Sequence, residues 1–256
     1  MYDAAFVNLE QGTGIVHCAP SHGVDDFNLC LQNKIESKYT VDDSGFYTNE
    51  IPHFEKLHVF KADLPVIEKL KSEQKLLKDD KLQHSYPHSW RSKAPLIYRA
   101  TPQWFISMDK GSLRNKAIKA IEDTNFYPAK GKERLLSMIE SRPDWCVSRQ
   151  RVWGVPLPIF ISKKTNEVLI DDQVFENIAN IYEKEGSDCW FSDDPQKFLG
   201  DKYKAEDYIK LEDIVEVWFD SGSTHSFVLE KRKDLKWPAS MYLEGSDQHR
   251  GWFHSS

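Results

Sequence analysis

Hydrophobic residues recur at helical spacing in four segments of the first 142 residues. The predicted helices are "VDDFNLCLQNK", starting near Asp25, and residues 62–80, 113–123 and 132–142. Asp63 is placed to cap the second helix and Ser112 the third, because short polar side chains favour the N-cap position. The fourth should end before Pro143, since proline disfavours the α conformation in the residue before it.

Three other segments predict short strands. "GIVHCAP" is expected to be a strand that runs into a turn, and "YTVDDSGFYTN" a hairpin with Asp-Ser-Gly at its turn. "IFISKKTNEVLI" predicts two strands around a polar turn.

The last third of the chain alternates strands and helices. "IVEVWFD" and "ASMYLEG" predict strands, and "SGSTHSFVLEKR" and "SDQHRGWF" predict the helical segments after them. This order is typical of a parallel sheet with crossover helices, so we expect an α/β fold. Ligands of such sheets bind outside the carboxyl ends of the strands, which here are "WFDSGSTH" and "LEGSDQH".

Composition indicates a folded protein of a reducing compartment. Charged residues make up 29% and aromatic residues 12% of the 256 residues, unlike a disordered chain. No apolar run approaches the roughly 20 residues that a bilayer crossing needs, and no signal-peptide pattern opens the chain. Four cysteines without a C-x-x-C pair argue against a zinc ribbon or a disulfide framework. We therefore expect a cytoplasmic protein without a membrane segment.

The segment 244–252 carries several polar side chains at the expected ligand-binding edge. Glu244, Asp247 and Gln248 together favour a binding function, because capping a helix needs only one of them. Gly245 would let a ligand approach the backbone, although an ordinary strand-to-helix turn explains this glycine equally well. Trp218 and Trp252 lie near the ends of the two strand–helix units and could wall a small apolar pocket. Periodicity alone favours a place in the core for both.

The segment "VHCAPSHGVDD" places His17, His22, Asp25 and Asp26 within ten residues. These side chains suit a metal site, a hydrolytic pocket in which Asp26 pairs with a cation, or simply acids in the first turn of a helix. The metal site is the weakest of the three, because no third ligand clusters with them.

Local basic stripes occur in this chain although its net charge is −6. One is "SKAPLIYRATPQW", and another is "DWCVSRQRVWG", where Trp145 and Trp153 flank Arg149 and Arg151. Arginine beside aromatic rings suits phosphate contacts and base stacking in single-stranded RNA. Structural salt bridges would explain the same spacing equally well.

Five motifs in order resemble the isoleucyl-tRNA synthetase family, in its bacterial and organellar branch. They are "GTGIVHCAPSHGVDDF", "QHSYPHSWRSKAPLIYRATPQWFISM", "RPDWCVSRQRVWGVPLPIF", "VWFDSGSTH" and "YLEGSDQHRGWFHSS". Valyl and leucyl enzymes share the "SRQ…WG" theme but not the last two motifs. The resemblance implies part of a Rossmann-like class I synthetase catalytic domain plus the C-terminal part of a mixed α/β editing domain of the CP1 type. By that resemblance residues 1–83 belong to the editing domain, 84–141 return to the catalytic core, and 142–256 are its second half, with an insertion at about 161–212.

The resemblance implies an ATP-dependent ligase with two sites. Glu244 would contact the aminoacyl-adenylate, with Asp247, Gln248 and His249 beside its adenosine, while Trp218 and Trp252 would line the isoleucine pocket. In the editing site, Asp26 would hold the amino group of valyl-tRNA and His17 would exclude the larger isoleucyl group. One methylene gives only about 1–3 kcal/mol of discrimination, which explains the need for such a second site.

The resemblance also implies cofactors and partners. The partners expected are isoleucine, ATP with Mg²⁺ and tRNA(Ile), and the full-length enzyme is expected to be a monomer. "YPHSWRSKAP" lacks the cysteine pair that some relatives use for zinc, so we expect neither zinc nor another metal site here. Ser21, where many relatives have glycine, and Glu216, where aspartate is more usual, are minor departures.

The HIGH-type and KMSKS ATP motifs of the family do not occur in these 256 residues. We therefore expect the sequence to be cut inside the catalytic domain, and the isolated chain to be inactive in ligation. Two alternatives remain. One is a non-catalytic tRNA-binding fragment using Arg149 and Arg151, and the other is a metal-dependent hydrolase using His17, His22 and Asp26.

Overall fold

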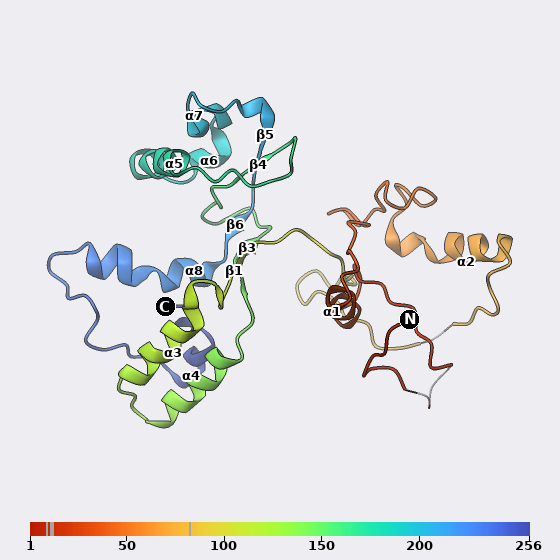
Figure 1. Ribbon diagram of the computed structural model, residues 1–256, viewed down its shortest axis with the longest axis horizontal. Coiled ribbons are helices and arrows are strands. Elements are labelled where there is room, and N and C mark those ends of the chain that lie inside the picture. The colour runs from red at the N-terminus through yellow and green to blue at the C-terminus, as the bar shows by residue number, and fades with distance from the viewer. Residues whose placement is uncertain (9, 11–12, 82) are drawn as a thin grey trace. The chain divides into compact units, whose positions relative to one another are not determined.

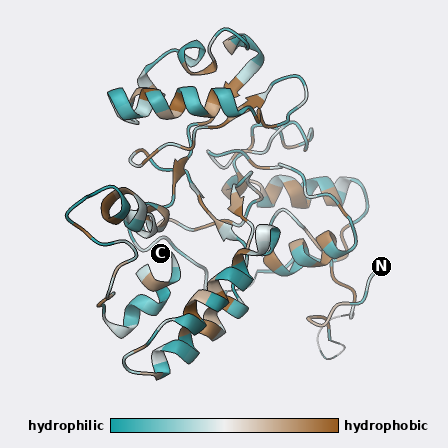
Figure 2. Cartoon of the chain, turned by 60° about the vertical axis from the view of Figure 1, so that its left-hand side comes forward, coloured by the Kyte–Doolittle hydropathy of each residue, from teal (hydrophilic) through white to brown (hydrophobic). Residues whose placement is uncertain are grey.

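A computed structural model describes residues 1–8, 10, 13–81 and 83–256, and the chain divides into two compact units, Met1–Pro102 and Gln103–Ser256. Each unit is described by itself, and Figure 1 traces its elements along the chain. Hydrophobic positions of the longer helices form brown patches on otherwise teal ribbons, as expected of amphipathic helices (Figure 2).

Among its described residues, the first unit contains two helices, α1 (Val24–Gln32) and α2 (Asp63–Ser72), and a 3₁₀ turn at Val59–Lys61. The prediction of α1 is confirmed. The predicted extent of α2 is wrong: it ends at Ser72, because Gln74 takes a left-handed φ of 56°, and Leu77 is left fully exposed. Asp63 is the first residue of α2 and not its cap, since Ala62 occupies the N-cap position without a side-chain bond.

The predicted hairpin at 39–49 forms as a tight turn. The Asp42 carboxylate accepts hydrogen bonds from the amides of Ser44 and Phe46, both at 2.9 Å, and Gly45 supplies the positive φ that the turn needs. Val41 and Tyr47 then pair as an isolated antiparallel bridge. The strand predicted at "GIVHCAP" is wrong, because no described segment pairs with residues 14–20, and only the turn that follows it is present.

The second unit contains a helix pair, α3 (Leu113–Asp123) and α4 (Lys130–Glu140), after a 3₁₀ turn at Lys110–Ser112. Both helices are confirmed predictions. Ile121, Leu135 and Ile139 form the buried cluster between them. Ser112 does occupy the N-cap of α3, but with a left-handed φ of 57° its side chain makes no capping bond.

Three short antiparallel pairs make up the strands described in the second unit. Phe105–Ile106 (β1) pairs with Trp145–Cys146 (β2), Ser148–Arg149 (β3) with Ile214–Val215 (β6), and Phe160–Ser162 (β4) with Tyr208–Lys210 (β5). The second strand predicted in "IFISKKTNEVLI" is reduced to the single bridge between Ile161 and Val168. β4 takes β5 as its partner instead, with Ile161 opposite Ile209.

The mixed helix-and-strand class is confirmed, but the parallel sheet predicted for the last third is not present among the described residues. After Ile214–Val215 the chain turns at once into helix α8 (Val217–Gly222) and a π-helical segment at His225–Glu230. Residues 239–245 remain extended without pairing, with Met241 and Leu243 exposed by 75% and 83%. A strand needs a neighbour for its backbone groups, and none of the described segments pairs with the backbone of this one. Two 3₁₀ turns, Ser246–Arg250 and Trp252–His254, follow it.

The residues that lie between β4 and β5 in the sequence form a separate hydrophobic cluster. It is built by α5 (Asp172–Glu185), α6 (Cys189–Ser192), α7 (Pro195–Leu199) and a 3₁₀ turn at Ala205–Asp207. Trp190 and Phe198 are fully buried at its centre, beside Phe160 at 2% exposure. Asp171 caps α5, and hydrogen bonds from Lys202 and Tyr203 lower the pKa of this carboxyl to about 2.

Candidate functional site

A chain of hydrogen bonds joins three of the predicted site residues in the second unit. Gln248 Nε2 donates to Asp247 Oδ2 at 3.1 Å, and the backbone amide of Trp252 donates to Gln248 Oε1 at 3.1 Å. The indole Nε1 of Trp252 then donates to the carbonyl of Ser221 at 3.2 Å. The chain of bonds therefore runs from the 3₁₀ turn at 246–250 to the last turn of α8.

Trp218 and Trp252, predicted from separate motifs, are brought to the same place. The Trp218 ring lies so close to Gly251 that a Cβ there would be 3.0 Å from its Cη2 atom. Trp252 stacks on Tyr242, with ring centres 4.8 Å apart and planes 32° apart. Trp218 is still 38% exposed, so it is not a core residue of the described chain. Tyr242 was not singled out in the sequence, although it opens the motif "YLEGSDQ".

Glycine permits the close approach between α8 and the end of the chain. A Cβ on Gly222 would lie 2.1 Å from the carbonyl oxygen and 2.7 Å from the carbonyl carbon of Ser255. Any larger residue would collide with this backbone. The helix that carries Trp218 and the turn that carries Trp252 therefore pack backbone against backbone.

Glu244 is exposed whereas His249 is buried. Glu244 is exposed and accepts no hydrogen bond within the described part of the chain, so its carboxylate is available to a ligand. His249 is buried to 8% exposure; its Nδ1 bonds the carbonyl of Ser246 at 2.8 Å, and its ring contacts Phe253. Its Nε2 faces Gly131 at the start of α4. In this arrangement His249 packs the turn against α4, whereas Gln248 bonds Asp247 and the amide of Trp252.

In the first unit, Asp26 ties the loop before α1 to the helix. Its Oδ2 accepts the amide of Ala19 at 2.8 Å. Partial burial, followed by the charge of Asp26, raises the pKa of the Cys18 thiol, so that this thiol stays protonated at neutral pH. His17 is exposed and makes no hydrogen bond among the described residues. Gly12, the first residue of the motif that contains them, lies outside the described residues.

His22 is occupied by structural bonds. Its Nδ1 pairs with the carbonyl of Tyr98 and its Nε2 with the hydroxyl of Thr40, each at 2.9 Å. Within residues 1–8, 10, 13–81 and 83–256, no three His, Cys, Asp or Glu side chains gather in a way that could hold a metal ion.

The two arginines of "SRQRVWG" differ in their surroundings. Arg149 donates to the carbonyls of Cys146 at 2.9 Å and Ser148 at 2.8 Å, so it supports the backbone of the β2–β3 segment. Arg151 is exposed, and Trp153 next to it is 89% exposed. Of the two arginines and two tryptophans of this segment, Arg151 and Trp153 are the ones exposed to a partner.

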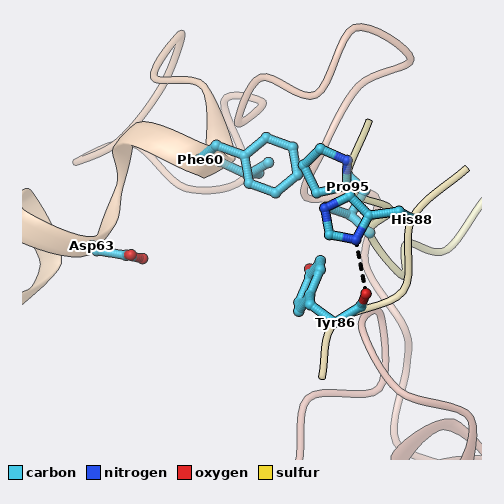
Figure 3. A pocket seen from close by; sticks show the side chains of 7 residues that line it. Phe60, Asp63, Tyr86, His88 and Pro95 are labelled. Atoms are coloured by element: carbon cyan, nitrogen blue, oxygen red, sulfur yellow. Dashed lines mark hydrogen bonds between the residues drawn. The ribbon is translucent and has the colours of Figure 1, made fainter. Parts of the chain in front are cut away.

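The first unit also contains an open cavity of about 490 Å³ that the sequence did not indicate. Aromatic and proline rings line it together with the Asp63 carboxylate, and His88 Nδ1 bonds the carbonyl of Tyr86 at 2.8 Å (Figure 3). Its walls come from residues 59–63 and 86–97. These segments are far apart in the sequence, so no local motif predicts the cavity. None of the predicted site residues lines it.

Comparison with known proteins assigns the chain to a class of protein. Residues 13–256 match the family of class I tRNA synthetases (I, L, M and V). The chain therefore belongs to this family. Over the described ranges, no helix has the length and apolarity that would let it cross a membrane.

Relatives with about half or more of their matched residues identical include isoleucine–tRNA ligases. The chain is 73% identical over 256 residues to that of Pelagibacter ubique (strain HTCC1062), covering all of this chain and 28% of the relative. It is 50% identical over 268 residues to that of Gluconobacter oxydans (strain 621H), again covering all of this chain and 28% of the relative. It thus spans little more than a quarter of the length of these curated relatives, and the resemblance seen in the sequence is confirmed at the level of the family.

Proposed function

We propose that this chain is part of an isoleucine–tRNA ligase that activates isoleucine with MgATP and transfers it to tRNA(Ile). The observation that carries the proposal is the convergence of Trp218 and Trp252, one indole from each of two separate motifs. Between them they offer apolar walls for a small aliphatic side chain. The free carboxylate of Glu244 suits the ammonium group or a ribose hydroxyl of the adenylate.

The second part of the proposal assigns the segments and surfaces. Residues 1–83 are the C-terminal part of an editing domain, 84–141 the connection, and 142–256 the second half of the catalytic domain. Asp247 and Gln248 lie on the nucleotide side, whereas His249 acts through its packing on α4. Arg151, with Trp153, contacts tRNA. The full-length enzyme works in the cytoplasm as a monomer. Sedimentation of the purified enzyme would test its monomeric state.

Isoleucine-dependent ATP–pyrophosphate exchange tests the proposal in the full-length protein. We expect Trp218→Ala to lower kcat/KM for isoleucine at least about tenfold, because even one methylene of lost contact in such a pocket is worth about that much. Trp237→Ala removes a half-exposed indole elsewhere in the second unit and should leave the exchange unchanged. We expect these 256 residues alone to show no exchange. A full-length protein that activates another amino acid in preference to isoleucine would overturn the proposal.

The editing role of Asp26 has its own matched pair of variants. Removing one partner of a desolvated charge pair costs about 2–5 kcal/mol, so Asp26→Ala should slow hydrolysis of valyl-tRNA(Ile) at least about tenfold. Asp25→Ala removes the neighbouring exposed acid of the same helix turn and should not. Isoleucine activation should be equal in both variants. Equal deacylation rates for the two variants would remove Asp26 from this role.

Two alternatives have distinct outcomes. A tRNA-binding fragment would bind tRNA in a salt-sensitive way without hydrolysing its ester, using Arg151 and Trp153. A metal-dependent hydrolase needs His17, His22 and Asp26 as ligands. The two hydrogen bonds of His22 do not favour that alternative, and stoichiometric zinc or iron in the purified protein would revive it.

A further inference from the structure

Arg142 lies two residues beyond the end of α4 and reaches the turn that carries Trp252. Its Nη1 donates a hydrogen bond to the carbonyl of His254. The guanidinium lies over the ring of Trp145, with its central carbon 4.8 Å from the ring centre. The side chain is thus held from two sides, by a backbone acceptor and by an aromatic face.

The Trp145 ring beneath Arg142 packs in turn on Phe219 of α8, with ring centres 6.1 Å apart. Glu216 is the N-cap residue of this helix and is only 7% exposed. Burial lowers the pKa of the Arg142 guanidinium, and the charge of Glu216 acts in the opposite sense. Burial and Glu216 together raise the pKa of the Asp220 carboxyl one turn later. The charge of Glu216 thus favours a charged guanidinium at Arg142.

His254 contributes its backbone and not a second positive charge to this arrangement. Burial, helped by Arg142 and Arg250, lowers the pKa of its imidazole to about 4, so the ring is neutral at neutral pH. The contact between Arg142 and the turn 252–254 therefore runs through the carbonyl group.

We propose that Arg142 is a positioning residue for the isoleucine side-chain pocket, because it holds the turn with Trp252 and the helix with Trp218 at a fixed spacing. This inference rests on the proposed function. The same two segments are also joined directly, by the hydrogen bond from Trp252 to Ser221 and by the packing of Gly222 on Ser255. Arg142 fastens them through the carbonyl of His254 and through Trp145, whose ring packs on Phe219 of α8.

The expected effect is on amino-acid recognition more than on ATP. A displacement of about 1 Å can cost about 100-fold in rate, so a partial loosening should raise the isoleucine KM about tenfold. Because the indoles form the walls, the preference for isoleucine over valine should fall as well. The KM for ATP should change less than the KM for isoleucine, since Arg142 bonds the turn 252–254 directly and reaches Gln248 only through the amide of Trp252.

The test uses Arg142→Met and Arg142→Lys in the full-length protein, with KM and kcat measured separately for isoleucine, valine and ATP. Methionine keeps an apolar stem but no donor, and lysine keeps one donor and the charge, so lysine should restore part of the lost preference. Arg99→Met is the matched control, because Arg99 is a similarly buried arginine of the first unit that bonds the carbonyl of Val41 and the carboxylate of Asp43. It should leave the isoleucine KM unchanged.

Glu216→Gln provides a second, milder variant. It removes the charge that favours the charged guanidinium of Arg142 and keeps the size of the side chain. If Arg142→Met does not fold, Glu216→Gln should still lower the preference for isoleucine over valine. An unchanged isoleucine KM and preference in these variants would overturn the role of Arg142. A wild-type protein that does not activate isoleucine would instead overturn the proposed function.

Discussion

Replacing Gly222 by alanine in the full-length protein should lower kcat/KM for isoleucine activation by about 100-fold, the cost expected of a displacement near 1 Å in an organised site. The added carbon would lie 2.1 Å from the Ser255 carbonyl oxygen, which belongs to the backbone and cannot rotate away as a side chain could. The turn with Trp252 must therefore move away from α8. Isoleucine-dependent ATP–pyrophosphate exchange measures the loss.

Gly23→Ala is the control for this substitution. A Cβ at Gly23 would meet nothing closer than 3.4 Å, an ordinary contact, and Gly23 lies in the first unit. Near-ultraviolet circular dichroism of both variants separates a local displacement from unfolding. Wild-type exchange by Gly222→Ala would show that the close approach of α8 to Ser255 is not needed for activation.

The second large effect is expected on the stability of the hydrophobic cluster around Trp190, which the chain forms after β4 and before β5. Trp190→Ala should lower the free energy of unfolding of this cluster by about 3–5 kcal/mol, as large-to-small changes of buried aromatic residues do. Trp190 is fully buried, and its ring centre lies 4.9 Å from that of Phe198 and 5.1 Å from that of Phe160. The substitution also leaves the carbonyl of Leu211 without the indole donor that now bonds it at 2.7 Å.

Urea unfolding followed by circular dichroism gives the measurement. Phe191 is the next residue and also aromatic, but it is 44% exposed, so Phe191→Ala should change the unfolding free energy by less than about 1 kcal/mol. Equal midpoints for the two variants would mean that this cluster does not depend on Trp190.

Helices could be predicted from the sequence where one face alone determines them. The apolar spacing in α3 and α4 and the proline after α4 are local signals, and both helices form where these signals place them. Strands need partners supplied by other parts of the chain, which explains why residues 239–245 do not form one here. The end of α2 was missed because a left-handed residue, Gln74, stops it without a glycine or proline.

The residues of the candidate site can be predicted from their motifs, but the orientations of their side chains cannot. Nothing near His249 in the sequence indicates that it would pack on Gly131 of α4. The contacts of Arg142 cannot be predicted locally for the same reason, since the carbonyl that it bonds belongs to His254. Such orientations depend on long-range packing, which a local pattern does not contain.

The strand pair β4–β5 has a consequence for how the length of this protein can vary. The chain enters the cluster around Trp190 at Phe160 and leaves it at Lys210, and these two residues are opposite each other in the pair. The entrance and exit are therefore only about one strand spacing apart. A short hairpin turn could join them, so the whole cluster could be shortened, enlarged or exchanged as a module while the host segments on either side keep their positions.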